Sequence, residues 1–151
     1  MSQDLLKNIK KLRLETKAGI IDCRQALEES QGDMKKAKLL LKQKGEKLAD
    51  KRKDRETKAG LVDAYVHLGG TIASLVSLSC ETDFVAHTKE IKTLAHEVAM
   101  QTAAMDPKTV KNLLEQEYIR DSSKKIKDLV KEVIAKTGEN VKIEEIKRLE
   151  V

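Results

Sequence analysis

The apolar positions of the first 45 residues recur at the three- or four-residue spacing of helices with one buried side. Breaks at Ala18-Gly19 and Gly32-Asp33 divide this stretch into three short helices, and Ser2 or Asp4 is the candidate N-cap of the first. So small a bundle would be only marginally stable alone. Its predicted core positions are Leu5, Ile9, Leu12, Cys23, Ala26, Leu27, Met34, Ala37, Leu40 and Leu41.

Beyond Gly45 the pattern turns polar, and basic residues alternate with acids as far as Lys58. This stretch is either the solvated continuation of the third helix or a charged linker that ends near Gly60. The basic residues are one basis for phosphate binding, but the interspersed acids and the lack of aromatics favour a solvated face. We therefore predict a module at 1–45, a charged helical linker at 46–60 and a core domain at 61–151.

Two runs rich in β-forming residues, 61–68 and 71–78, follow this linker. Gly69-Gly70 lies between them and suits a hairpin turn, because primed turns need positive φ. The alternation of the second run is imperfect, which predicts a bulge or burial on both faces. A hairpin alone is not stable, so a third strand or helices must cover it.

The helical period returns after Ala86 and continues to Gly138, a natural left-handed helix stop. Thr88 is the candidate cap of the first helix, Asp106-Pro107 ends it and caps the next, and Ser122 or Ser123 caps the last. The tail at 141–151 has both strand-like and helix-like spacing. A bulged strand paired with the hairpin would supply its missing partner, which gives an α+β fold with a three-stranded antiparallel sheet packed with helices.

The chain has 151 residues, 40% hydrophobic and 36% charged, with a net charge of +5 and only three aromatic residues. This composition supports a folded core and argues against aromatic-lined ligand pockets and base-stacking platforms. The excess of basic residues lies in the first third of the chain. Such an excess can steer a chain to an acidic protein or a polyanion.

No constellation of catalytic residues is evident. His67, His87 and His96 have no nucleophile in a recognisable motif, and Cys23 and Cys80 lack the spacing of a zinc site or a disulfide framework. There is no P-loop motif. We therefore expect a protein that is not an enzyme and that has no cofactor and no metal. No apolar run is long enough to span a membrane, and the first residues do not resemble a signal or transit peptide, so the expected location is the cytoplasm.

Two bulky residues, Ile20 and Ile21, follow the glycine of the first turn. Burying both in so small a bundle is difficult, which favours an exposed apolar knob. The alternative is a hydrophobic staple around the turn.

A second unusual segment, Thr82-Asp83-Phe84, holds the only Phe of the chain, in a connection after a strand. An aromatic beside an acid on a loop is typical of an interface anchor. The alternative is that Thr82 or Asp83 caps a helix while Phe84 fills the core.

These two segments resemble the elongation factor Ts family. Residues 16–27 read T-K-A-G-I-I-D-C-R-Q-A-L, close to the signature of the family's small ubiquitin-associated-like (UBA-like) module of three helices. Residues 80–86 read C-E-T-D-F-V-A, and 136–141 read K-T-G-E-N-V, similar to the family's signatures before a helix and before the last strand. The resemblance spans almost the whole chain.

The resemblance implies a guanine-nucleotide exchange factor that promotes GDP release from elongation factor Tu. It implies that Asp83 and Phe84 enter the GTPase domain near its magnesium site, that Thr82 and Val85 beside them also bind this partner, and that Ile20 and Ile21 contact a helix of the GTPase domain.

The chain has room for one core subdomain, whereas longer members of the family have two, so it resembles the short form. A homodimer through the core sheet would replace the missing half. Two other functions stay open at this point. One is a nucleic-acid or ribosome-binding module that uses the basic first third, which we do not expect, and the other is an adaptor that binds through Ile20 and Ile21 alone.

Overall fold

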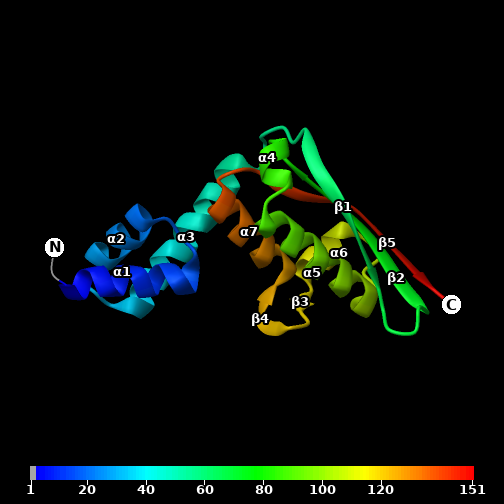
Figure 1. The fold of residues 1–151 in the computed structure, drawn as a ribbon, viewed down its shortest axis with the longest axis horizontal. Coiled ribbons are helices and arrows are strands. Elements are labelled where there is room, and N and C mark those ends of the chain that lie inside the picture. The colour runs from blue at the N-terminus through cyan, green and yellow to red at the C-terminus, as the bar shows by residue number, and fades with distance from the viewer. Residues whose placement is uncertain (1–2) are drawn as a thin grey trace. The chain divides into compact units, whose positions relative to one another are not determined.

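The computed structural model describes residues 3–151, so the candidate cap Ser2 lies outside the described residues. The chain divides into two compact units, Met1–Lys51 and Arg52–Val151. Figure 1 shows the first unit as helices only and the second as a sheet with helices. The predicted division at 45 and 60 into module, linker and core stays a prediction.

The first unit consists of helices α1 (Gln3–Thr16), α2 (Ile20–Glu29) and most of α3 (Met34–Arg52). The three helices occur where the apolar spacing predicts them. Their shared core is small and contains no aromatic side chain, as expected for so short a bundle. It is formed by Ile9, Leu12, Cys23, Ala26, Leu27 and Ala37.

The stretch between the third helix and the first strand is only half helical. Helix α3 continues through Gly45 and ends at Arg52, and strand β1 begins at Ala59. The carboxamide of Asn140 donates hydrogen bonds to the backbone carbonyls of Lys53 (3.2 Å) and Arg55 (2.8 Å). A continued helix would use these carbonyls for its own next turn. The prediction of a helix extending to Gly60 is therefore wrong beyond Arg52.

A three-stranded antiparallel sheet forms the framework of the second unit. Its strands are β1 (Ala59–Val66), β2 (Ile72–Cys80) and β5 (Val141–Glu150), in the order β1-β2-β5. The glycines of the hairpin have φ of 90° and 71°, so the expected positive φ is confirmed. The expected primed turn is wrong, because the hydrogen-bonded turn runs from His67 to Gly70 within a connection of residues 67–71, and Leu68 at its first central position does not have positive φ. The pairing of β2 with β5 shifts register between Ser77 and Leu78. The tail is thus the bulged strand that completes the sheet.

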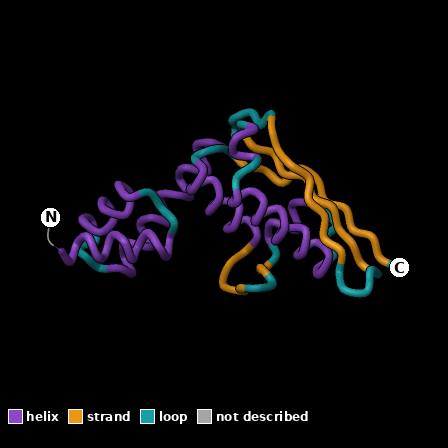
Figure 2. Tube along the Cα trace, in the orientation of Figure 1, coloured by secondary structure: helices purple, strands orange, loops and turns teal. Residues whose placement is uncertain are grey.

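Helices cover one face of this sheet, as Figures 1 and 2 show. They are α4 (Asp83–Ala86), α5 (Lys89–Met105), α6 (Val110–Glu115) and α7 (Ile126–Thr137). The central strand turns Ser74, Val76, Leu78 and Cys80 inward, all buried. The Ser74 hydroxyl donates to the backbone carbonyl of Ala99 in α5 at 2.6 Å, so the only polar group of this row has a partner. Within the described residues, no helix is long and apolar enough to cross a membrane.

The opposite face of the sheet carries an apolar patch that we call the open face. Strand register places Val66, Ala73 and Leu149 in one row across the three strands, and Ala64 and Leu75 in the next. Val66 and Leu149 are 64% and 73% exposed. The apolar side chains of the open face are Val62, Ala64, Val66, Ala73, Leu75 and Leu149.

Two predicted helix starts in the second unit are wrong, whereas the Thr88 cap and the Gly138 stop are confirmed. Asp106, with φ of 45°, closes α5 rather than opening α6, whose cap is Thr109. The stretch around Ser122 and Ser123 forms a small ribbon of β3 (Glu117–Tyr118) and β4 (Asp121–Lys125).

A buried glutamine explains this ribbon. The Gln101 side chain, fully buried in α5, donates to the carbonyl of Glu117 (3.0 Å) and accepts from the Ile119 amide (3.0 Å). An interior amide must find such partners, and here it fixes a backbone turn that has no local sequence signal.

Tyr118 of this ribbon gives a spectroscopic prediction. Burial, and then its hydrogen bond to the Glu97 carboxylate (2.5 Å), raise the pKa of Tyr118 from 10 to about 12. The neutral phenol therefore contributes stability below pH 10, which is lost as the pH rises through the folded pKa. An absorbance titration of tyrosinate should show one of the two tyrosines ionising near pH 12 in the folded chain, a step absent from Tyr118→Phe.

Candidate functional site

An exposed aromatic tip stands at the junction of β2 and α4. Thr82 is the N-cap of α4, and its hydroxyl oxygen accepts the Val85 amide hydrogen at 3.3 Å. The cap starts a single turn whose inner side carries Val85 and Ala86, 5% and 1% exposed. The outer side carries Phe84, which is 83% exposed. The turn thus buries its small residues and leaves its one large aromatic in water.

This arrangement decides between the two interpretations of the segment. Thr82 does cap a helix, but Phe84 does not fill the core. Full burial of a Phe side chain stabilises a protein by roughly 1.5–3 kcal/mol, which this chain forgoes at the tip. An aromatic held in solvent on an ordered turn is typical of a binding anchor. We call Thr82, Asp83 and Phe84 the tip.

The charged groups of the tip are also exposed. The Asp83 side chain is 84% exposed, and its carboxylate lies 3.5 Å from Nδ1 of His87. The same ring nitrogen lies 2.8 Å from the backbone carbonyl oxygen of Asp83. Beneath the tip, burial raises the pKa of the Cys80 thiol, which donates to the Thr82 carbonyl at 3.2 Å. Cys80 is therefore a neutral, packed support and not a nucleophile.

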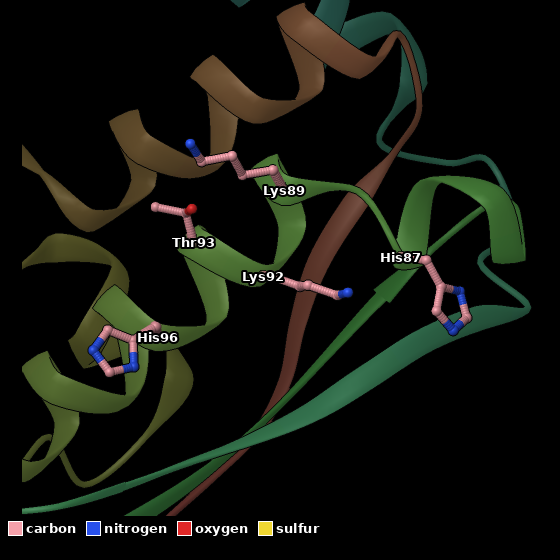
Figure 3. Close-up of a pocket in the computed structure, with 5 residues that line it drawn as sticks. All are labelled: His87, Lys89, Lys92, Thr93 and His96. Carbon is pink, nitrogen blue, oxygen red and sulfur yellow. The ribbon is translucent and has the colours of Figure 1, made fainter.

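A basic hollow lies beside the tip along α5. It is lined by His87, Lys89, Lys92, Thr93 and His96. Figure 3 shows four of these residues on successive turns of α5, with His87 at the end nearer α4. Asp63 of β1 lies 3.8 Å from the His96 ring and balances part of this charge. The hollow is shallow, and its charge suits the acidic surface of a protein better than an enclosed ligand.

The first unit presents the other predicted pair of residues. Ile20 and Ile21 are the first two residues of α2, and they are 55% and 72% exposed. Gly19 precedes them as the N-cap without a side-chain hydrogen bond. Cys23, Ala26 and Leu27 make the buried side of the helix instead. The two isoleucines therefore form an apolar knob, and not a staple that buries both.

The described residues contain no candidate metal centre. Across residues 3–151 no group of three or more His, Cys, Asp or Glu side chains is arranged to hold a metal ion. The sequence interpretation named Thr82 but missed the Glu139 carboxylate, which accepts both its amide and its hydroxyl hydrogen. These residues are 57 positions apart, so no local pattern connects them.

Comparison with known proteins shows which family this chain is similar to. Residues 81–151 match the family model described as Elongation factor TS. The chain is 41% identical to Elongation factor Ts of Thermotoga neapolitana, over an alignment that covers 100% of this chain and 97% of the relative. It is 40% identical to the protein of that name from Thermoanaerobacter sp., with 94% of this chain and 92% of the relative covered. The chain belongs to the elongation factor Ts family.

Membership of the elongation factor Ts family implies a role in translation elongation, as a nucleotide exchange factor for elongation factor Tu. The family model begins at Glu81, directly before the tip, and extends to the end of β5. The alignment with the Thermotoga protein has 194 positions, more than the 151 residues of this chain. The relative therefore contains residues that this compact member of the elongation factor Ts family lacks.

Proposed function

We propose that this chain promotes GDP release from elongation factor Tu by inserting the tip near the magnesium and phosphate site of the GTPase domain. The single observation that carries the proposal is Phe84, 83% exposed on a capped turn whose inner side is buried. In this proposal Phe84 wedges between elements of the partner, and Asp83 disturbs the groups that hold magnesium. The chain acts in the cytoplasm, where translation takes place.

Nucleotide exchange of this kind needs no covalent chemistry, so we propose that the protein is not an enzyme and uses no cofactor. The factor must bind the nucleotide-free partner more tightly than the GDP-bound partner. This coupling is reciprocal, because GDP weakens binding of the factor by the same ratio. A thousandfold loss of GDP affinity requires about 4 kcal/mol of differential binding. One buried Phe contributes roughly 1.5–3 kcal/mol, so the tip needs a second contact.

We assign that second contact to the knob of Ile20 and Ile21, carried by a UBA-like module. Both side chains are exposed at the start of α2 and can bury apolar area against a partner helix. Thr82 acts from the edge of the tip as its cap, and Val85, which is buried, anchors the tip from within. The exposed knob and the exposed tip are thus two separate apolar contacts to one partner.

Release of a fluorescent GDP analogue from elongation factor Tu tests the proposed function directly. The chain should accelerate release in proportion to its concentration until the rate saturates. Acceleration that disappears steeply with salt, together with binding to nucleic acid, would instead favour the rival that uses the basic first third. No acceleration at any concentration would overturn the proposal. Binding to the partner without acceleration, dependent on Ile20 and Ile21, would favour the adaptor.

We further propose that two copies of the chain pair through the open face of the sheet. The open face places exposed apolar side chains on all three strands, with Leu75 on the central one. Leu75 lies opposite Lys147, and Glu145 lies one row away on the same strand. A two-fold axis would bring such a patch against itself, with acidic and basic residues of both copies at its border. A second copy therefore fits this face through its apolar side chains, since Lys147 and Glu145 already pair with each other at 3.0 Å within one copy.

Leu75→Lys is expected to separate the two copies. In a symmetric interface the substitution places two like charges in the same apolar contact, and desolvating them opposes association. Sedimentation velocity at micromolar concentration should give the mass of two chains for the wild type and of one for the variant. Leu39→Lys is the control, because Leu39 is an exposed leucine on α3. A wild-type mass of one chain would reject the dimer.

A further inference from the structure

The turn that joins α7 to β5 has no part in the function proposed so far. It consists of Gly138, Glu139 and Asn140, the centre of the third sequence signature. Gly138 has φ of 74° and ends α7, so the chain reverses at once. The reversal brings the Glu139 side chain and the Asn140 backbone amide against the segment that precedes α4.

Glu139 binds the base of the tip with both carboxylate oxygens. Its Oε2 accepts the backbone amide hydrogen of Thr82 at 3.0 Å, and its Oε1 accepts the Thr82 hydroxyl hydrogen at 2.7 Å. Because the hydroxyl proton goes to Glu139, the hydroxyl lone pairs are free to accept the Val85 amide at 3.3 Å. Glu139 thus orients the hydroxyl that caps α4.

Glu81 and Asn140, the neighbours of Thr82 and Glu139, make a second contact of the same kind in the opposite direction. The Glu81 carboxylate accepts the backbone amide hydrogen of Asn140 at 2.7 Å and lies 3.4 Å from the Arg55 guanidinium. The hydrogen bond from Asn140, and then the charge of Arg55, lower the pKa of Glu81 below its usual value. Two consecutive residues on each side therefore exchange carboxylate–amide bonds, so that the turn after α7 holds the start of α4 at two points.

Helix α4 has only four residues and cannot hold its own orientation. Its outer side chains, Asp83 and Phe84, are 84% and 83% exposed, so packing against the core does little to fix them. Besides the contacts of His87 with Asp83 and of the Cys80 thiol with the Thr82 carbonyl, the tip is held by the inward packing of Val85 and Ala86 and by the two hydrogen bonds from Thr82 to Glu139. The Glu139 carboxylate accepts two of the hydrogen bonds that hold Thr82.

We propose that Glu139 is a positioning residue for nucleotide exchange, which preorganises the tip through Thr82 without touching the partner. This inference rests on the proposed function. If only a fraction of free molecules has the tip correctly placed, the apparent dissociation constant rises by the inverse of that fraction. A preordered tip avoids this loss of apparent affinity, and it also avoids the entropy cost of ordering the tip upon binding. Once the complex has formed, the partner itself holds the tip.

Glu139→Ala should therefore weaken the response to factor concentration and spare the maximal rate. We expect the factor concentration that gives half-maximal acceleration of GDP release to rise about tenfold, since two charge-assisted hydrogen bonds are lost at a half-exposed site. The maximal rate should stay within about twofold of the wild type. Glu139→Gln, which keeps one acceptor oxygen, should give an intermediate value.

Two further variants separate positioning from general stability. Glu132→Ala removes another glutamate contact of the second unit, the 2.7 Å ion pair with Lys124, and should leave the half-maximal concentration unchanged. Glu139→Ala in a Phe84→Ala background should have little further effect, because Glu139 acts only through the tip. Circular dichroism and thermal melting of each variant establish that it is folded at the assay temperature.

The outcomes distinguish the two proposals. Acceleration by the wild type with an unchanged half-maximal concentration for Glu139→Ala overturns the positioning role and leaves the function intact. A fall in maximal rate that persists in the Phe84→Ala background, with a lower melting temperature, also overturns it in favour of a structural role. No acceleration by the wild type overturns both proposals. A shifted half-maximal concentration that vanishes in the double variant supports the inference.

Discussion

Phe84→Ala is expected to remove most of the acceleration of GDP release from elongation factor Tu while leaving the fold intact. The side chain is 83% exposed, so its loss opens no cavity in the core. In the complex, its burial contributes about 1.5–3 kcal/mol, which corresponds to a roughly 10- to 100-fold loss of exchange activity. Titration of the variant against a fluorescent GDP complex measures the loss. The maximal rate should fall, because the wedge acts after binding.

The matched control is Leu68→Ala. Leu68 lies in the hairpin connection and is 90% exposed, so the substitution removes a comparable exposed apolar group away from the tip. Its exchange curve and thermal melting should match those of the wild type. Equal activity of Phe84→Ala and wild type would place the contact elsewhere, first of all at Ile20 and Ile21.

The sequence predicts those elements of this fold that short-range chemistry determines. The Thr88 cap, the Gly138 stop and the glycine hairpin are all where expected, because each depends on a hydroxyl or a positive φ at one position. The third strand is predicted by a different argument, the need of a hairpin for a partner. Its bulge follows from the mixed spacing of the tail.

The errors arise where distant residues decide the local structure. Helix α3 stops at Arg52 because the next carbonyls accept hydrogen bonds from Asn140, more than 80 positions later in the chain. The β3–β4 ribbon forms around the buried Gln101 side chain. Serine and aspartate residues cap helices in many proteins, but here Asp106 closes α5 with a φ of 45° and Ser123 lies in β4.

The candidate site also has a part that the sequence predicts and a part that depends on distant residues. The sequence singles out Thr82, Asp83 and Phe84 but leaves two interpretations of the aromatic equally open, because exposure is a property of the folded unit. The inward packing of Val85 and Ala86 settles this, since a single helical turn cannot bury all of its side chains. The sequence shows Glu139 only as part of a signature. Its two hydrogen bonds with Thr82 are visible only in the structure.

Gly60→Ala is expected to destabilise the second unit strongly. A Cβ atom at this position would lie 2.1 Å from the Leu78 carbonyl oxygen and 3.0 Å from the Ser79 Cα atom. Both are backbone atoms of β2, the central strand of the sheet, so no side-chain rotation relieves the overlap. Gly60 pairs directly with Ser79, and the strands must separate to admit the methyl group.

We expect the free energy of unfolding to fall by about 3 kcal/mol, at the upper end of single-residue effects. Urea unfolding followed by circular dichroism measures it at one fixed protein concentration. Ser122→Thr is the control, since it adds one methyl group at an exposed strand position outside the open face and should change stability by less than about 0.5 kcal/mol. An unchanged midpoint for Gly60→Ala would mean that β1 lies further from β2 than the backbone contact requires. The sequence placed Gly60 at the end of a linker, where an added methyl group would have almost no effect, so this measurement also separates the two descriptions of the residue.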